Sequence, residues 1–256
     1  LAKFPNGLHA LKSNFYLAQL YFADGLESNA VKHYEFVVGK SRNEFTEQSL
    51  ARLSQIHLKA KDYTKAVPML KRLETEADFP QNKTYAQSNL MKAYYEQEDF
   101  NNAEMYATIV LANTKVDDRI KSDAQIIVAR SAIKTNNEAK AKLAYAELLK
   151  IAKGELAAEA LYYDAYFKNK DGKFEDSNKA VQKLAKEYSG YKYFGAKGLI
   201  VMAKNYYQLK DDFSATSILE SVIKNFSTYT DVVTEAQTEL SIIKGEISKT
   251  NSSITN

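Results

Sequence analysis

Apolar residues recur along this chain with a helical period that short polar turns interrupt. Between Tyr85 and Gln97 they stand at positions 86, 90, 93 and 94, and after Glu98-Asp99 they recur at 103, 106, 107, 110 and 111. Residues three or four apart share one face of an α-helix. Asp99 is a typical N-cap residue, because its carboxylate accepts hydrogen bonds from the free amides of the first turn. The pattern predicts two helices joined by a tight turn.

This phrase repeats along the chain. Small residues stand at positions 30, 66, 103, 141, 177 and 216, and the turns before three of them read Asp62-Tyr63, Asp99-Phe100 and Asp212-Phe213. A period of 36 to 39 residues is typical of a stack of helix–turn–helix units. A small residue lets two helix axes approach to ~8–10 Å. We expect turns near Asp62, Asp99 and Asp212, and a longer loop over 168–173 in the fifth unit.

The two ends of the chain also fit a repeat array. Phe4-Pro5-Asn6 is interpreted as the end of a second helix, so residues 1–10 are expected to close a preceding repeat of a longer parent protein. Near the other end, a stripe of Ala236, Leu240, Ile243 and Ile247 predicts one more helix, either the first of a seventh unit or a cap. Residues 249–256 form a polar tail, frayed or a linker. One repeat domain is therefore predicted over 1–256.

The repeated positions resemble the tetratricopeptide repeat (TPR) motif over about residues 12 to 248. Leu90, Tyr94, Ala103 and Val110 match it, and Phe79-Pro80 and Phe4-Pro5 match its closing Pro. The chain departs from the motif because it has no Trp, lacks most closing Pro residues, has Ala18, Ser54 or Met91 at the Gly-like position, and exceeds the usual period of ~34 residues. The resemblance implies an all-α, right-handed α-solenoid of about six TPR-like repeats plus a C-terminal helix.

Composition and motifs argue against several classes of function. The chain has no Cys, only three His and a net charge of +3, which predicts neither a disulfide, a metal site nor a nucleic-acid partner. No apolar run reaches the length of a membrane span. The stretch 190–197 lacks the Gly-Lys-Ser/Thr ending of a phosphate loop, and no Gly-x-Ser-x-Gly motif occurs. We expect a non-enzymatic protein without a cofactor.

The resemblance implies a concave face lined by first-helix residues about 2, 5, 9 and 12 into each unit. Aromatic and Arg side chains there suit protein binding. Phe15 and Gln19 stand where chaperone-binding TPR proteins carry the Lys and Asn of their carboxylate clamp, so that function is not expected. The predicted partner-binding residues are Phe15, Gln19, Phe22, Arg52, Gln55, Lys92, Tyr95, Arg130, Tyr162, Tyr166 and Asn205.

The predicted function is a scaffold or adaptor that binds a segment of a protein partner in the concave groove. Two alternatives remain open: a helical-repeat protein that binds a glycan or peptidoglycan fragment, and a structural segment that spaces other domains. The Tyr- and Lys-rich units, such as residues 205–213, are similar to bacterial envelope TPR proteins of the TolA-binding and outer-membrane assembly lipoprotein types. That similarity implies a periplasmic or outer-membrane-associated protein, with a cytoplasmic location as the alternative.

Overall fold

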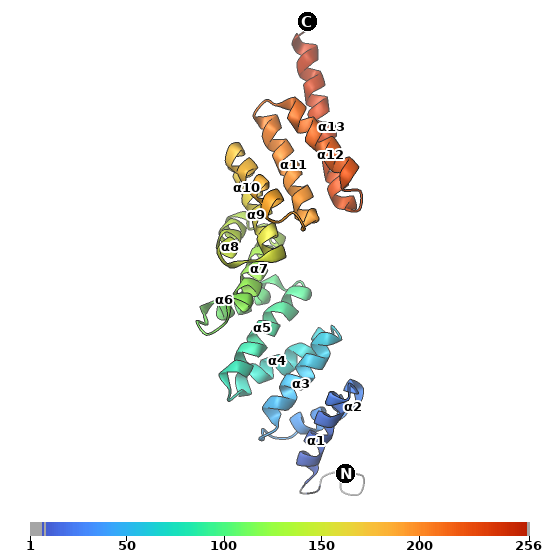
Figure 1. Ribbon diagram of the computed structural model, residues 1–256. Coiled ribbons are helices and arrows are strands. Elements are labelled where there is room, and N and C mark those ends of the chain that lie inside the picture. Colours follow the sequence, from blue (N-terminus) through green and yellow to red (C-terminus); the bar gives the residue numbers. More distant parts are fainter. Residues whose placement is uncertain (1–6, 8, 255–256) are drawn as a thin grey trace. The chain divides into compact units, whose positions relative to one another are not determined.

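A computed structural model describes residues 7 and 9–254 of the chain. Thirteen α-helices and no β-strand occur among these residues (Figure 1), which confirms the predicted all-α class. The helices are α1 (Ala10–Ala23), α2 (Glu27–Val38), α3 (Thr46–Lys59), α4 (Tyr63–Glu76), α5 (Pro80–Glu96), α6 (Phe100–Ala112), α7 (Asp118–Lys134), α8 (Glu138–Ile151), α9 (Gly154–Lys170), α10 (Phe174–Glu187), α11 (Lys192–Gln208), α12 (Asp212–Asn225) and α13 (Thr230–Ile254).

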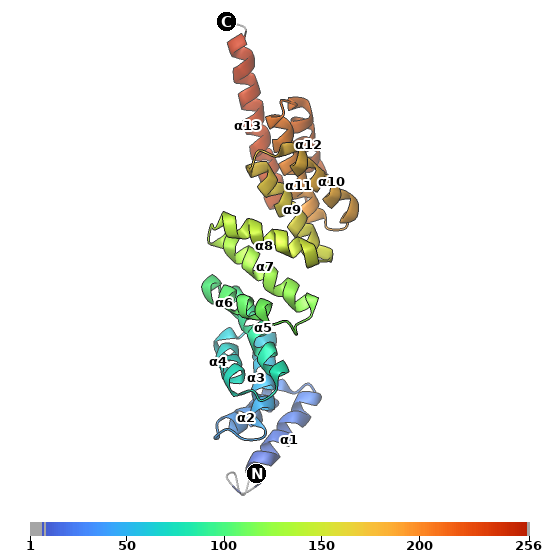
Figure 2. The same cartoon turned by 90° about the vertical axis from the view of Figure 1, so that its left-hand side faces the viewer.

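The helices belong to two compact units. Unit 1 spans Leu1–Asn136 and holds α1 to α7, and unit 2 spans Asn137–Asn256 and holds α8 to α13. Within each unit, every helix packs on the next one in sequence (Figures 1 and 2). First helices of successive pairs also contact each other: α3 with α5 and α5 with α7 in unit 1, and α9 with α11 and α11 with α13 in unit 2. Each unit therefore has a layer of first helices and a layer of second helices.

The backbone repeats with the sequence. Each first helix ends in a C-cap residue, and the residue after that C-cap has a positive φ between 55° and 75°. Five positions further along the chain comes a small residue that is fully buried. Two of these left-handed residues are Gly, whose missing Cβ permits that conformation. The turn residues are Gly25, Lys61, Glu98, Asn136, Gly172 and Lys210, and the small residues are Ala30, Ala66, Ala103, Ala141, Ser177 and Ala215.

This repeating pattern of turn residues and buried small residues corrects two predictions made from the sequence. In the sixth unit the N-cap is Asp211, whose carboxylate accepts from the Ser214 amide at 2.9 Å, and the buried small residue is Ala215. Position 216 was wrong because two adjacent Asp residues, 211 and 212, offer the same cap signal. The loop of the fifth unit is not longer than the others, because α9 continues to Lys170 and Gly172 takes the usual turn position.

The same kind of cap begins four of the second helices. In α4, α6, α8 and α12 an Asp or Asn side chain accepts a hydrogen bond from the amide three residues later, as an N-cap does. The predicted turns at Asp62 and Asp99 are confirmed by these contacts. The N-cap residues are Asp62, Asp99, Asn137 and Asp211.

Each unit has a core of its own. In unit 1 one continuous cluster runs from α1 to α7, with fully buried Leu50, Leu53, Leu70 and Leu90. In unit 2 two clusters lie around α9–α11 and α11–α13. A continuous core built from neighbouring repeats is typical of repeat proteins, because no single pair buries its apolar face alone.

Three predictions concern the helix ends. α5 begins at Pro80, five residues before the predicted start, since Pro is favoured at the first helical position. α13 continues to Ile254, so residues 249–254 are helical where a frayed tail or linker was expected. The motif Phe4-Pro5-Asn6 lies outside the described residues.

Candidate binding groove

A groove lies between the first helices α3 and α5 of unit 1. Its volume is about 590 Å³. Arg52 and Gln55 of α3 line one wall, and Gln81 and Tyr85 of α5 line the other. Because the contacting helices α3 and α5 are both first helices, this groove opens on the first-helix layer of unit 1. We call it the α3–α5 groove. Its other lining residues are Glu44, Glu47, Gln48, Ala51, Phe79 and Asn82.

A second groove continues from the first on the other side of α5. It has a volume of about 800 Å³ and shares Gln81 and Tyr85 with the α3–α5 groove. Lys92 and Asp123 form an ion pair across it, with 2.5 Å between the Lys Nζ and Asp Oδ2 atoms. We call it the α5–α7 groove. Its remaining lining residues are Pro80, Thr84, Ser88, Asn89, Asn113, Lys115, Val116, Asp117, Arg119 and Ile120.

Polar contacts between loops fix the spacing of α3 and α5. The Glu47 carboxylate, in the first turn of α3, accepts from the amides of Asp78 and Phe79 at 3.1 and 3.2 Å. It also accepts from the Asn82 side chain at 2.7 Å. Arg42, in the loop before α3, donates to the carboxylate of Asp78, in the loop before α5, at 2.5 Å. These contacts hold the N-terminal ends of the two helices together at the mouth of the α3–α5 groove.

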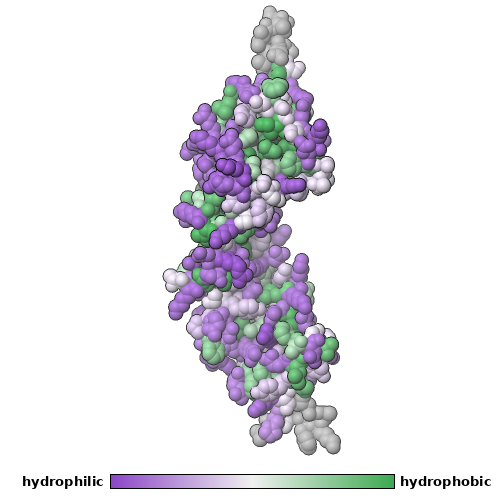
Figure 3. All heavy atoms as spheres, in the orientation of Figure 1, coloured by the Kyte–Doolittle hydropathy of each residue, from purple (hydrophilic) through white to green (hydrophobic). Residues whose placement is uncertain are grey.

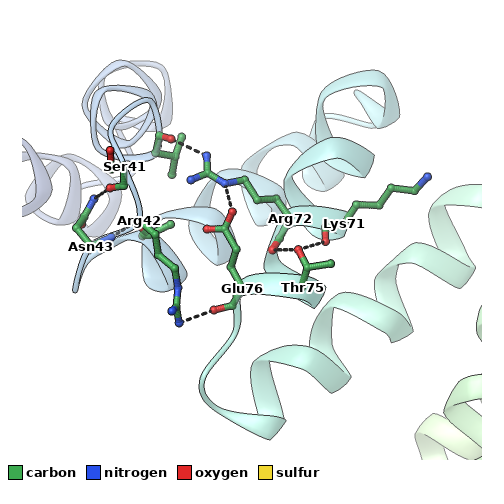
Figure 4. A network of polar contacts seen from close by, with 9 residues as sticks. Ser41, Arg42, Asn43, Lys71, Arg72, Thr75 and Glu76 are labelled. Carbon is green, nitrogen blue, oxygen red and sulfur yellow. Dashed lines mark hydrogen bonds and ion pairs between the residues drawn. The ribbon is translucent and has the colours of Figure 1, made fainter.

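A neighbouring hydrogen-bond network joins α4 to the end of α2 and to the loop before α3 (Figure 4). Arg72 of α4 donates through Nε to Glu76 at 2.6 Å and through Nη1 to the carbonyl of Val38 at 2.5 Å. Arg42 donates to the Glu76 carbonyl at 2.9 Å. Arg72 thereby satisfies a carbonyl at the end of α2, which has no partner within its own helix. Charged side chains therefore hold the loop before α3 and the end of α2 against α4.

Tyr85 is the central side chain of the two grooves. It is half-buried and stands in the first-helix layer between Arg52 on α3 and the α5–α7 groove. Burial raises the pKa of the Tyr85 phenol, and the Ser54 hydroxyl and the Arg52 charge oppose that rise. The phenol is therefore protonated at neutral pH. It offers a partner both a ring face and a hydroxyl, a combination that is frequent where proteins bind one another.

The first-helix layer of unit 2 is built differently. Two of its cations are paired, since Lys204 lies 2.8 Å from Glu239, and Lys197 lies 3.4 Å from Glu235 and 5.6 Å from the Tyr162 ring centroid. A hollow of about 560 Å³ is lined by residues of α13 alone. Figure 3 shows hydrophilic and hydrophobic residues interspersed on the face in view. Unit 1 thus has the better-defined groove between helices.

Three predicted binding residues are buried. Phe15 of α1 is 5% exposed and stacks on Phe45, with 4.4 Å between ring centroids. Tyr162 of α9 is 7% exposed, and burial raises the pKa of its phenol. Asn205 of α11 is fully buried. These side chains contribute to packing within their units and present no surface to a partner, so we leave them out of the candidate site.

Three other predicted residues line the grooves. Arg52 and Gln55 lie in the α3–α5 groove, where the Arg52 Nη1 donates to the Gln55 Oε1 at 2.9 Å. Arg52 also stands over the ring of Phe22, at 4.7 Å from its centroid. Lys92 lies in the α5–α7 groove. Sequence spacing therefore places these three residues on the surface that the two grooves line.

The remaining predicted residues are half-buried and line neither groove. Gln19 and Phe22 lie on α1, and Tyr95 lies on α5 with its ring edge-on to Phe100. Arg130 lies on α7, and the Tyr166 ring on α9 has the Lys170 ammonium at 5.6 Å. The proposed role of these five residues in binding stays a prediction.

Two residues that both grooves share, Gln81 and Tyr85, were not among the predicted binding residues. Gln81 and Tyr85 were not chosen because the first helix of the third unit was predicted to begin at Tyr85, whereas α5 begins at Pro80. With Pro80 as the first helical residue, positions 81, 85, 88 and 92 stand about 2, 6, 9 and 13 into the helix, close to the spacing expected for the inner face. The signal that could have found them is Pro as a helix start.

Comparison with known proteins shows the fold. A tetratricopeptide repeat protein from Parabacteroides merdae ATCC 43184 aligns with 89% of this chain and 98% of its own, with a TM-score of 0.54 and 11% identity. PilW, a type IV pilus biogenesis factor, aligns over 91% of this chain and 100% of its own, with a TM-score of 0.50 and 16% identity. These likenesses confirm the tetratricopeptide-repeat fold that the resemblance of the repeated residues implies.

A third structure is longer than this chain. It is a signal transduction ATPase with numerous domains and a tetratricopeptide repeat sensor, from Pyrococcus horikoshii, with a TM-score of 0.54 and 18% identity. The alignment covers 96% of this chain and 42% of the ATPase chain. No family model matches the sequence, and no curated protein matches it either.

No group of three or more His, Cys, Asp or Glu side chains among the described residues could hold a metal ion. None of the helices in the described part is both long and apolar enough to cross a membrane.

Proposed function

We propose, from the tetratricopeptide-repeat fold and the two joined grooves, that this chain is a non-enzymatic scaffold that binds an extended segment of a protein partner on the first-helix layer of unit 1. The observation that carries the proposal is the continuity of the α3–α5 and α5–α7 grooves through Gln81 and Tyr85. Small molecules usually bind in pockets that enclose most of their surface. A long groove that crosses three helices therefore suits an extended peptide better than a compact small molecule.

Carboxamide side chains support a peptide ligand. A carboxamide offers both a donor and an acceptor, and therefore matches the N–H and C=O groups of an extended main chain. Gln48 and Gln81 make no hydrogen bond to other residues that the structure describes, so both functions are available to a partner. Six such residues line the two grooves: Gln48, Gln55, Gln81, Asn82, Asn89 and Asn113.

A glycan is the second candidate ligand. Aromatic rings and carboxamides also pair with the faces and hydroxyls of sugars, and Phe79, at 58% exposure, lies beside Gln81 in the α3–α5 groove. We favour a peptide because ionic groups line the α5–α7 groove, and charged contacts give a protein partner orientation and association rate. A periplasmic or outer-membrane-associated location remains part of the proposal, with PilW, a pilus biogenesis factor of the same fold, as its support.

Selection of peptides from a random 12-residue phage-display library tests the proposal. A double variant, Gln81→Ala with Tyr85→Ala, removes the two side chains that the grooves share. We expect it to bind the peptides selected by the wild type at least about tenfold more weakly, which corresponds to about 1.4 kcal/mol. Fluorescence anisotropy with labelled peptides measures this difference.

The matched control is Gln208→Ala with Phe213→Ala. Both residues are exposed in unit 2, Phe213 at 82%, and neither lines a groove of unit 1. Circular dichroism checks that both double variants keep the helical content of the wild type. Equal loss of peptide binding in the two variants, or full binding by the Gln81 and Tyr85 variant, would refute the groove as the site. Retention of sugar oligomers in place of peptides would favour the glycan.

A further inference from the structure

The α5–α7 groove has an apolar floor and a charged rim. Its apolar side chains are Pro80 and Tyr85 of α5, Val116 in the loop before α7, and Ile120 in the first turn of α7. Val116 is buried at 7% exposure, and Ile120 is half-buried. The Ser88 hydroxyl in the same groove is buried and makes no hydrogen bond within the described chain. The charges on the rim decide which peptide fits this floor.

The two acidic residues of this groove are already engaged. The Asp117 carboxylate accepts from the Ile120 amide at 2.9 Å and caps the N-terminus of α7. Asp123 pairs with Lys92 at 2.5 Å. Each carboxylate is therefore compensated by a helix N-terminus or by a cation from the chain itself.

The groove also has two further cations. Lys115 and Arg119 line it, and neither forms an ion pair with another residue that the structure describes. Arg119 is exposed in the first turn of α7, where the helix dipole adds further positive potential. Cations without a partner of opposite charge, beside a helix N-terminus, attract a carboxylate.

The α3–α5 groove has the opposite balance. Arg52 there donates to Gln55 and stands over Phe22, and Glu47 is used by the loop contacts. Glu44 is exposed and has no ion pair among the described residues. The joined grooves therefore have a positive end at α7 and a weakly negative end at α3. Electrostatic complementarity of this kind fixes the direction in which a segment binds.

We propose that the partner segment is acidic at one end, and that it places carboxylates over Lys115 and Arg119 while an apolar side chain lies on Tyr85, Val116 and Ile120. The proposal rests on the proposed function, because it names the chemistry of the ligand for that same groove. An extended segment of this kind gains charge-assisted hydrogen bonds from the guanidinium and the ammonium group.

Charge reversal tests the inference. The wild type, a variant with Lys115→Glu and Arg119→Glu, and a control with Lys83→Glu and Lys121→Glu are each used to select from the same random 12-residue phage library. Lys83 and Lys121 lie on α5 and α7, line neither groove and change the net charge equally. We expect the wild type and the control to enrich Asp and Glu, and the groove variant to lose that enrichment.

Affinity measurements make the comparison quantitative. One enriched acidic peptide, labelled with fluorescein, should bind the groove variant at least tenfold more weakly than the control at low ionic strength, and this ratio should shrink in added salt, which screens exposed charges. Neutral replacements, Lys115→Gln with Arg119→Gln, give a second reading that does not depend on introducing acidic side chains. These neutral variants should also bind the acidic peptide more weakly than the wild type, but by a smaller factor than the charge-reversal variant.

The outcomes separate the two proposals. Peptides without acidic bias that still require Tyr85 would refute the acidic segment and leave the groove as the binding site. Acidic peptides that bind the Lys115 and Arg119 variants as well as the wild type would also refute it. Selected peptides that ignore Tyr85 would refute the proposed function itself.

Discussion

Replacing Asn205 by Leu is expected to lower the free energy of unfolding of unit 2 by about 2–4 kcal/mol. The Asn205 side chain is fully buried and donates to the Ser177 hydroxyl at 2.8 Å and to the Asn178 carboxamide at 2.7 Å. It also accepts from Asn169 at 2.7 Å. These bonds join α9, α10 and α11, and Leu would leave several buried polar groups without partners. Chemical denaturation measures the difference.

Two further variants make this prediction specific. Asn225→Leu changes an exposed Asn of α12 and should leave stability within about 0.5 kcal/mol of the wild type. Combining Asn205→Leu with Asn178→Leu should cost less than the sum of the single changes, because both partners of one bond are then removed. A wild-type stability for Asn205→Leu would show that this network contributes little, and additive losses would show that the Asn205–Asn178 bond is not the source of the effect.

A double variant with Lys61→Gly and Glu98→Gly is expected to stabilise unit 1 by about 1–2 kcal/mol. Both residues have a positive φ, 55° and 58°, in which an L-residue is strained by ~1–2 kcal/mol. Gly removes that strain, and its greater freedom in the unfolded chain offsets part of the gain, by ~0.5–1 kcal/mol at each site. Both side chains are exposed and form no ion pair with other described residues, so little else is lost.

The reverse substitution is the control. Gly25 occupies the same turn position in the first unit, with a φ of 75°, and an added Cβ would meet no atom within 4 Å. Gly25→Lys should therefore destabilise unit 1 through backbone strain alone, by about 1 kcal/mol. Thermal or urea unfolding measures the expected gain in stability of the double variant and the expected loss for Gly25→Lys. A destabilised double variant would mean that these turns are held by side-chain contacts instead.

The repeat was predictable from the sequence because a helix crossing excludes large side chains. Ala30, Ala66, Ala103 and Ala141 are fully buried where the spacing places them. Only in the sixth unit was the predicted position of the small residue wrong, by one residue. There Asp211 and Asp212 are adjacent, and either could serve as the N-cap. The resolution of that ambiguity depends on the fold, since only Ala215 lies at the buried crossing.

The candidate site was harder to predict because helical spacing gives the helix face on which a residue lies but not how far neighbouring helices bury it. Asn205 and Tyr162 lie on first helices as expected, yet neighbouring helices cover them. Arg52 and Lys92 were found because charged side chains stay at the surface. Tyr85 was missed because Pro80 was interpreted as the end of one unit, when it begins α5. The grooves between α3, α5 and α7 follow from contacts between repeats, which a single repeat does not encode.

Site-directed photocrosslinking tests the central claim most directly. p-Benzoylphenylalanine is placed at Gln81, which lines both grooves, and in a second protein at Met105, an exposed α6 residue that lines neither. Each protein is irradiated with biotin-labelled peptides selected by the wild type, and the products are identified by mass spectrometry. We predict strong crosslinks from position 81 and background levels from position 105. Crosslinks from position 105 without any from position 81 would contradict binding in the grooves of unit 1.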